Sequence, residues 1–84
     1  MRKVRESMDC ETIKQLIETG LPGSDVSVSG DDGVHFQATV VSDQFVGVPT
    51  LKRHRMVYAT LGDKMGGEIH ALALRTQAPE ERKR

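Results

Sequence analysis

The sequence is poor in cysteine and has no long hydrophobic run. Its 84 residues include one cysteine, so the chain by itself cannot form an intrachain disulfide, a redox cysteine pair or a cysteine-rich zinc site. No apolar stretch approaches the roughly 20 residues that a membrane span needs, and the first residues lack the apolar core of a signal peptide. We therefore expect a cytoplasmic protein that is neither exported nor anchored to a membrane.

Net charge is also absent. Twelve lysines and arginines balance twelve aspartates and glutamates, which argues against a protein that neutralises nucleic acid over its whole surface. Any basic binding site must be local. The chain has no tryptophan, and its aromatic residues, Phe36, Phe45 and Tyr58, are core candidates rather than stacking platforms for single-stranded nucleic acid.

Signatures of enzymes are missing as well. The sequence contains no P-loop, dinucleotide-binding fingerprint, HExxH pattern or activated nucleophile. We therefore expect no catalytic residues and a binding protein rather than an enzyme.

The length determines the expected domain organisation. Eighty-four residues suffice for one thin hydrophobic core and are too few for two. We expect a flexible basic lead-in at residues 1–8, one folded domain at residues 9–81 and a short basic tail at residues 82–84.

The first half of the domain predicts a helix and a β-hairpin. The helix is expected to begin after Asp9, a candidate N-cap, and to end at Gly20. Residues 25–29 and 35–41 alternate apolar and polar side chains, and a turn-forming tetrad at residues 30–33 joins them. The expected core face of this hairpin comprises Val26, Val28, Phe36, Ala38 and Val40.

The second half predicts a central helix at residues 50–65, a strand at residues 69–76 and a short helix at residues 78–81. The core-facing stripe of the central helix is expected to comprise Leu51, His54, Val57, Tyr58, Leu61 and Met65. Its solvent side is expected to comprise Lys52, Arg53, Arg55 and Met56. In the strand, the face with Ala71 and Ala73 is expected to pack against a helix, because its side chains are small. The expected fold class is α+β, with a mixed three-stranded sheet, a right-handed crossover and the helices on one face.

The start of the predicted central helix is basic. Lys52, Arg53 and Arg55 lie where the helix dipole is positive, and each opposes it at a cost of about a few tenths of a kcal/mol. Three interpretations are open: contact with nucleic-acid phosphates, contact with an acidic partner or anionic cofactor, or a solvated polar face. The cost at the helix start favours a binding role.

Three histidines are candidate metal ligands. His35 and His70 open the second and third predicted strands, so two imidazoles at one edge of the sheet could bind a metal. A partner would have to supply the remaining ligands, because two histidines do not complete a zinc or iron site. Ordinary hydrogen-bonded roles are the alternative. For His54, on the packing stripe, a structural role is expected.

Three motifs at this spacing resemble the BolA family of small stress-related proteins. They are Phe45-x-Gly47, the run from Leu51 to Tyr58, and Ile69-His70-Ala71-Leu72. The resemblance extends over residues 11–80, and the hairpin at residues 28–37 is most similar to the IbaG-type branch. The resemblance implies an α-β-β-α-β-α fold similar to type II KH domains.

The resemblance also implies two functions. One is partnership with a monothiol CGFS glutaredoxin around a [2Fe-2S] cluster in iron homeostasis, and the other is DNA binding as a transcriptional regulator. In the family, the histidine at the start of the last strand is a cluster ligand, and His70 occupies that position. The second ligand is a cysteine or histidine of the hairpin loop. This chain has no cysteine there, and His35 at the exit of the loop is the candidate.

The leading hypothesis is a non-enzymatic adaptor that binds a monothiol glutaredoxin and holds a [2Fe-2S] cluster through His70 and His35. A glutaredoxin cysteine and glutathione would supply the other ligands, and the basic helix start would dock the partner or glutathione. No cofactor is expected in the isolated chain, which would be a monomer or weak homodimer. The alternative hypothesis is a DNA-binding regulator of the stress response that places Lys52, Arg53 and Arg55 on phosphates.

Overall fold

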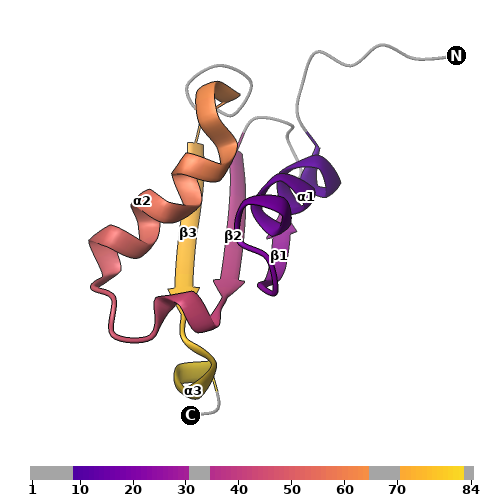
Figure 1. Ribbon diagram of the computed structural model, residues 1–84. Helices are drawn as coiled ribbons and strands as arrows, with labels where there is room; N and C mark the ends of the chain where they lie inside the picture. Colours follow the sequence, from indigo (N-terminus) through magenta and orange to yellow (C-terminus); the bar gives the residue numbers. More distant parts are fainter. Residues whose placement is uncertain (1–8, 31–34, 65–70, 83–84) are drawn as a thin grey trace, which may run out of the picture.

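A computed structural model describes residues 9–30, 35–64 and 71–82 of the chain. The elements are α1 (Cys10–Gly20), β1 (Asp25–Ser29), β2 (His35–Val41), the 3₁₀ helix η1 (Asp43–Phe45), α2 (Thr50–Leu61), the 3₁₀ helix η2 (Gly62–Lys64), β3 (Ala71–Gln77) and α3 (Pro79–Arg82). Helices α1 and α2 lie side by side over one face of the sheet, and α3 lies beyond the end of β3 (Figure 1). The predicted α+β class is confirmed. The predicted lead-in at residues 1–8 lies outside the described residues.

The sheet has three strands in the order β1-β2-β3. Strand β1 pairs antiparallel with β2, and Asp25 lies opposite Val41. Strand β3 pairs parallel with β2, and Ala71 lies opposite His35. This register confirms the predicted hairpin and the mixed sheet. Because β2 and β3 are parallel, the connecting helix α2 runs back against the strand direction.

Helix α1 begins at the predicted cap. The Asp9 carboxylate accepts a hydrogen bond of 2.8 Å from the backbone N–H of Thr12, which satisfies a donor that the helix itself leaves unpaired. At the other end, a Cβ atom on Gly20 would lie 2.5 Å from Cγ2 of Thr60 in α2. The glycine therefore permits the close approach of the two helices.

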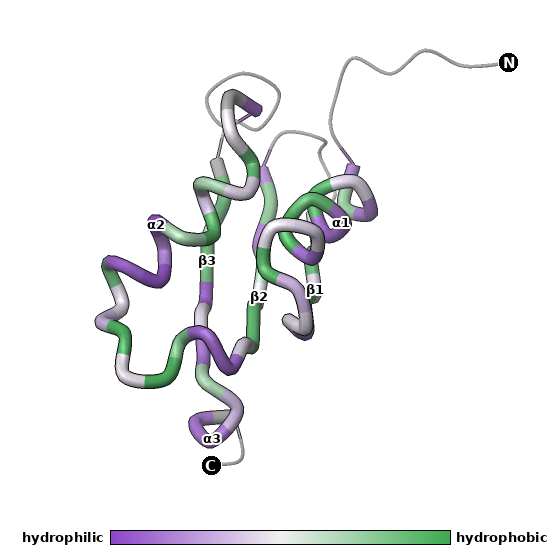
Figure 2. Tube along the Cα trace, viewed as in Figure 1, coloured by the Kyte–Doolittle hydropathy of each residue, from purple (hydrophilic) through white to green (hydrophobic). Residues whose placement is uncertain are grey.

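The hydrophobic core lies between the helices and the covered face of the sheet. Figure 2 shows hydrophobic residues within all three strands and hydrophilic residues along the first turns of α2. The buried hydrophobic residues of the core are Ile13, Ile17, Leu21, Val26, Phe36, Ala38, Val40, Phe45, Val57, Leu61, Leu72 and Ala78. The predicted core face of the hairpin is thus confirmed, with Val28 packed half-buried against the same cluster.

Helix α2 differs from its prediction in length and in the side that it buries. It ends at Leu61 because the next residue, Gly62, has a φ of 59°, which glycine adopts without steric strain. Met65 lies outside the described residues. Leu51 was placed in the predicted core stripe but is 66% exposed, and Arg53, predicted at the surface, is 8% exposed. Both predictions are wrong, because the buried stripe begins at Arg53 and continues turn by turn to Leu61.

Strand β3 buries the opposite face from the one predicted. Leu72 is buried and Leu74 packs half-buried against the core, whereas Ala73 is exposed. The prediction that the alanine face packs against a helix is therefore wrong. Burying the leucines removes more apolar area from water, and strand alternation then leaves Ala73 on the open face. The predicted first residue of this strand, Ile69, lies outside the described residues.

Candidate functional site

One predicted metal ligand, His35, is described by the structure, and the other, His70, precedes the first described residue of β3 in the sequence. His35 is the first residue of β2 and is exposed. It lies in register with Ala71, the first residue of β3. His70 precedes Ala71 in the sequence and lies outside the described residues. The structure therefore brings His35 next to the residue that follows His70.

His35 presents an accessible imidazole at a strand end, which is a donor suited to iron. It belongs to the open face of the sheet, because exposed and buried residues alternate from His35 onwards along β2. Within residues 9–30, 35–64 and 71–82, no group of three or more histidine, cysteine, aspartate or glutamate side chains could hold a metal ion. A metal bound through His35 would therefore need ligands from outside these ranges, such as His70, or from a partner.

His54 has the structural environment that its position predicts. Its side chain is half-buried, and its ring meets the Tyr58 ring edge-on, with centroids 6.4 Å apart and an interplanar angle of 81°. This geometry is a favourable aromatic contact within one helix. The expected semi-buried histidine is confirmed.

Two of the three basic residues at the start of α2 are exposed. Lys52 and Arg55 lie at the surface, and neither side chain makes an ion pair within the described part of the chain. The N-cap residue, Pro49, offers no side-chain hydrogen bond, and the first turn contains no acid. The side-chain charges therefore add to the positive end of the helix dipole.

Arg53 points into the protein instead. Its Nε donates to the Val48 carbonyl at 2.7 Å, and its terminal nitrogens donate to the Glu81 carboxylate at 2.8 and 3.0 Å. One of them also donates to the Thr76 carbonyl at 3.4 Å, and the guanidinium lies 5.7 Å from the centre of the Phe45 ring. The hydrogen bonds to Glu81 raise the pKa of Arg53 above its ordinary value, while burial opposes this. Arg53 thus joins α2 to β3 and α3, and its guanidinium is not a surface contact.

No local pattern marks Glu81 as the partner of Arg53, because 28 residues separate them. The signal that α2 does contain is the four-residue spacing of Arg53, Val57 and Leu61. An arginine at one end of such a stripe does not by its residue type indicate burial, although the aliphatic stem of arginine packs well against apolar surface. The same shift in helix phase exposes Leu51.

The two candidate regions lie at opposite ends of the sheet. Figure 1 shows α2 running against β2 and β3, so that its first turn lies near the ends of these strands. The hydrogen bond from Arg53 to Thr76, near the end of β3, ties it there. His35 begins β2, a strand of seven residues, which spans about 20 Å at about 3.3 Å per residue. The structure therefore does not bring Lys52 and Arg55 together with His35.

These features define a small α+β protein whose mixed sheet carries helices on one face and two separate surfaces of functional interest. The family model described as BolA-like protein matches residues 18–81. The chain belongs to the BolA family. None of the helices in the described ranges is long and apolar enough to cross a membrane.

Named relatives and a solved structure agree with this assignment. DNA-binding transcriptional regulator BolA from Vibrio cholerae is 47% identical over 80 residues, covering 95% of this chain and 72% of its own length. Human BolA-like protein 1 is 35% identical over 83 residues, or 94% of this chain, and the chain spans only 55% of its length. A BolA homologue from Coxiella burnetii has 49% identity and a TM-score of 0.83, covering 92% of this chain and 99% of that chain.

Proposed function

We propose that the chain is a non-enzymatic adaptor that binds a monothiol glutaredoxin and shares a [2Fe-2S] cluster with it, in iron-sulfur cluster trafficking and iron and stress homeostasis. The observation that carries this proposal is the register of β2 with β3. It pairs His35 with Ala71, the residue bonded to His70. His35 thus begins a strand whose parallel neighbour begins at the residue that follows His70 in the sequence.

The spacing of the strands supports ligation by both histidines. Neighbouring strands lie about 4.8 Å apart, and consecutive Cα atoms are about 3.8 Å apart. These distances are compatible with two imidazoles on one iron. Strand alternation places Ala73 on the open face with His35 and Leu72 on the covered face. Ligation by both histidines requires the two imidazoles to meet at one iron.

The cluster would be completed by the partner. His35 and His70 would hold one iron, and a glutaredoxin cysteine with glutathione would hold the other. Bound in this way, the cluster would supply electron storage at a potential raised by the neutral imidazoles. The chain offers only part of the ligand set, so its role is to complete and orient a cluster that the partner also binds.

The first test is the colour of the complex. We expect co-expression with a CGFS glutaredoxin to give a heterodimer with visible cluster absorption and circular dichroism, and His70→Ala to abolish the dichroism because an iron loses a ligand. His35→Ala should also change the spectrum, because the same iron then loses its other histidine ligand. The matched control is His54→Ala, which removes a histidine from α2 and should leave the colour intact. A colourless heterodimer, or unchanged spectra for His70→Ala, would contradict the proposal.

A second function, DNA binding by a transcriptional regulator, is favoured by one observation. Lys52 and Arg55 are exposed at a helix start without a side-chain cap, so phosphates could meet both side chains and the positive end of α2. Arg53 is left out of this contact, because Glu81 binds its guanidinium.

The salt dependence of duplex DNA binding tests this second function. Two phosphate contacts predict a logarithmic salt slope of about −1.8, so affinity should fall about tenfold between 50 and 200 mM salt. The double variant Lys52→Glu/Arg55→Glu should remove binding in a fluorescence anisotropy titration. Lys14→Glu, which reverses a charge on α1, is the matched control. Undiminished binding by the double variant would rule out this surface as the DNA site.

A further inference from the structure

The outer side of α2 carries an open apolar groove beside its two exposed cations. The groove measures about 650 Å³ and is lined by Pro49, Leu51, Lys52, Arg55, Met56 and Ala59. Among the described residues, no acidic side chain lines it. We call this the α2 groove.

Leu51 is the residue of the α2 groove that most strongly indicates an apolar occupant. It is 66% exposed, and leaving a leucine in water is unfavourable compared with covering it. Met56 is half-buried beside it and packs partly against the core, and methionine adapts readily to different apolar partners. An occupant with apolar side chains would therefore gain most of its affinity here.

The charges of the α2 groove indicate the sign of the charge that its occupant should carry. Lys52 and Arg55 make no ion pair within the described ranges, and the uncapped first turn of α2 adds its own positive potential. A carboxylate placed at this end would offset both the side-chain charges and the potential of the helix start. The charge complement of the α2 groove is an acidic segment.

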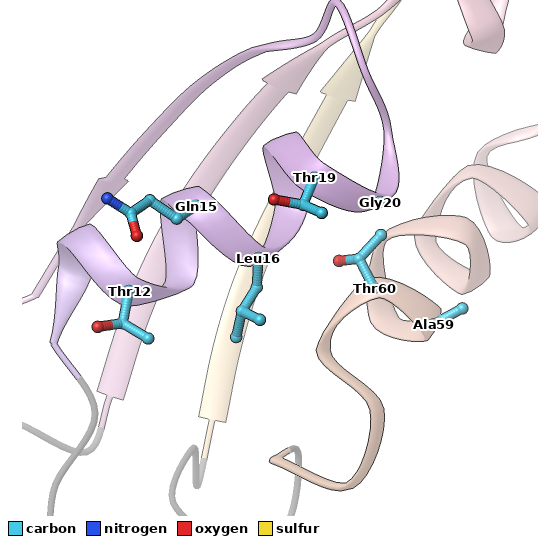
Figure 3. A pocket seen from close by; sticks show the side chains of 7 residues that line it. All are labelled: Thr12, Gln15, Leu16, Thr19, Gly20, Ala59 and Thr60. Carbon is cyan, nitrogen blue, oxygen red and sulfur yellow. The ribbon is translucent and has the colours of Figure 1, made fainter.

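The surface continues from the α2 groove onto α1. A second hollow of about 460 Å³ is lined by Thr12, Gln15, Leu16, Thr19, Gly20, Ala59 and Thr60, and it shares Ala59 with the α2 groove. Figure 3 shows its side chains projecting from the two helices, with Leu16 between Thr12 and Thr60. The described residues that line this second hollow are all uncharged. From Leu51 to Thr60 the rise along α2 is about 14 Å, so the surface is cationic at one end and neutral at the other.

We propose that this surface docks an acidic amphipathic segment of a second protein. Its apolar residues, at helical spacing, would cover Leu51 and Met56. Its carboxylates would meet Lys52 and Arg55, and its other end would be uncharged where it crosses Ala59 toward α1. His35 is not among the described residues that line this surface, so docking does not require that candidate cluster ligand.

Two other occupants fit these features less well. A nucleic-acid backbone makes little use of an apolar floor, and two cations provide few phosphate contacts. A second copy of the chain would have to offer an acidic apolar stripe, but α1 buries Ile13 and Ile17 on its apolar side, and α3 has only four residues. A separate protein segment remains the best match of shape and charge.

Peptide display against the whole chain, without glutaredoxin or DNA, tests this inference. We expect selected 16-residue peptides to carry aspartate or glutamate at one end and large apolar residues at intervals of three and four. The dissociation constant of a labelled selected peptide should rise more than about tenfold with Leu51→Asp, because this substitution removes an apolar contact. It should rise about tenfold with Lys52→Glu/Arg55→Glu, because this double variant reverses both charges. Leu51→Asp should leave the melting temperature unchanged or raised, because an acid suits the first turn of a helix.

Lys14→Glu and His35→Ala are matched controls that should leave peptide affinity within about twofold. Peptides without acidic enrichment, or binding that survives Leu51→Asp, would overturn the proposal. So would failure to select any peptide that shifts the amide resonances of α2, or sedimentation data showing that wild-type copies associate through Leu51. Competition by duplex DNA alone would assign the surface to nucleic acid. None of these measurements involves a cluster, so they succeed or fail independently of the glutaredoxin proposal.

Discussion

Replacing Arg53 with alanine is expected to lower the free energy of unfolding by about 2–4 kcal/mol. The variant would lose the hydrogen bonds to the Val48 and Thr76 carbonyls and the paired contacts with Glu81. It would also lose the packing of the arginine stem, which lies in a buried stripe of α2. For a domain of this size, we expect the melting temperature to fall by about 10–25 °C.

The two ends of this ion pair should differ in their effect on stability. Glu81→Ala should cost less, about 1 kcal/mol, because the glutamate side chain is 48% exposed and water can replace it. Arg55→Ala, two residues further along α2 and exposed, is the matched control and should stay within about 0.5 kcal/mol of wild type. Thermal and urea unfolding measure all three. Equal losses for Arg53→Ala and Arg55→Ala would show that burial of Arg53 does not stabilise the fold.

Replacing Phe45 with alanine should have the largest effect on the fold, about 3–5 kcal/mol. Phe45 is fully buried, so truncation leaves a cavity and removes the ring beneath the Arg53 guanidinium. A loss of this size approaches the whole stability of many small domains. We expect the variant to lose amide dispersion in its NMR spectrum near 25 °C.

Phe45→Leu is the control for this experiment, because leucine retains much of the buried volume and should keep the native dispersion at a smaller cost. The double variant Phe45→Ala/Arg53→Ala should lose less free energy of unfolding than the sum of the two single losses, since the two side chains are in contact. A Phe45→Ala variant that melts at the wild-type temperature would refute the assignment of Phe45 to the core.

The hairpin and the first helix could be predicted because their signals are local. Alternation along residues 25–29 and 35–41 specifies the covered face of the sheet, and a slip by one residue would expose Phe36 to water. The Asp9 cap lies three residues from the N–H that it binds. Such features need no knowledge of the rest of the chain.

The exposed surface of α2 could not be predicted in the same way. Whether an arginine faces water or the core depends on what lies opposite it, and Arg53 meets Phe45, Thr76 and Glu81, all from other elements. With Arg53 turned inward, Leu51 is left at the surface. The basic helix start therefore offers two cations and an apolar floor instead of three cations.

The sequence by itself pointed to the family, through the resemblance of its three motifs. It also determined the order of the elements and the position of His35 at a strand start, because periodicity, capping and turn residues act over a few neighbouring positions. Only the tertiary structure decided which side of α2 is buried and where its cations lie relative to the sheet. The parallel crossover turns α2 against β2, and the start of α2 is thereby carried toward the end of the sheet opposite His35. That separation divides the candidate residues between two surfaces.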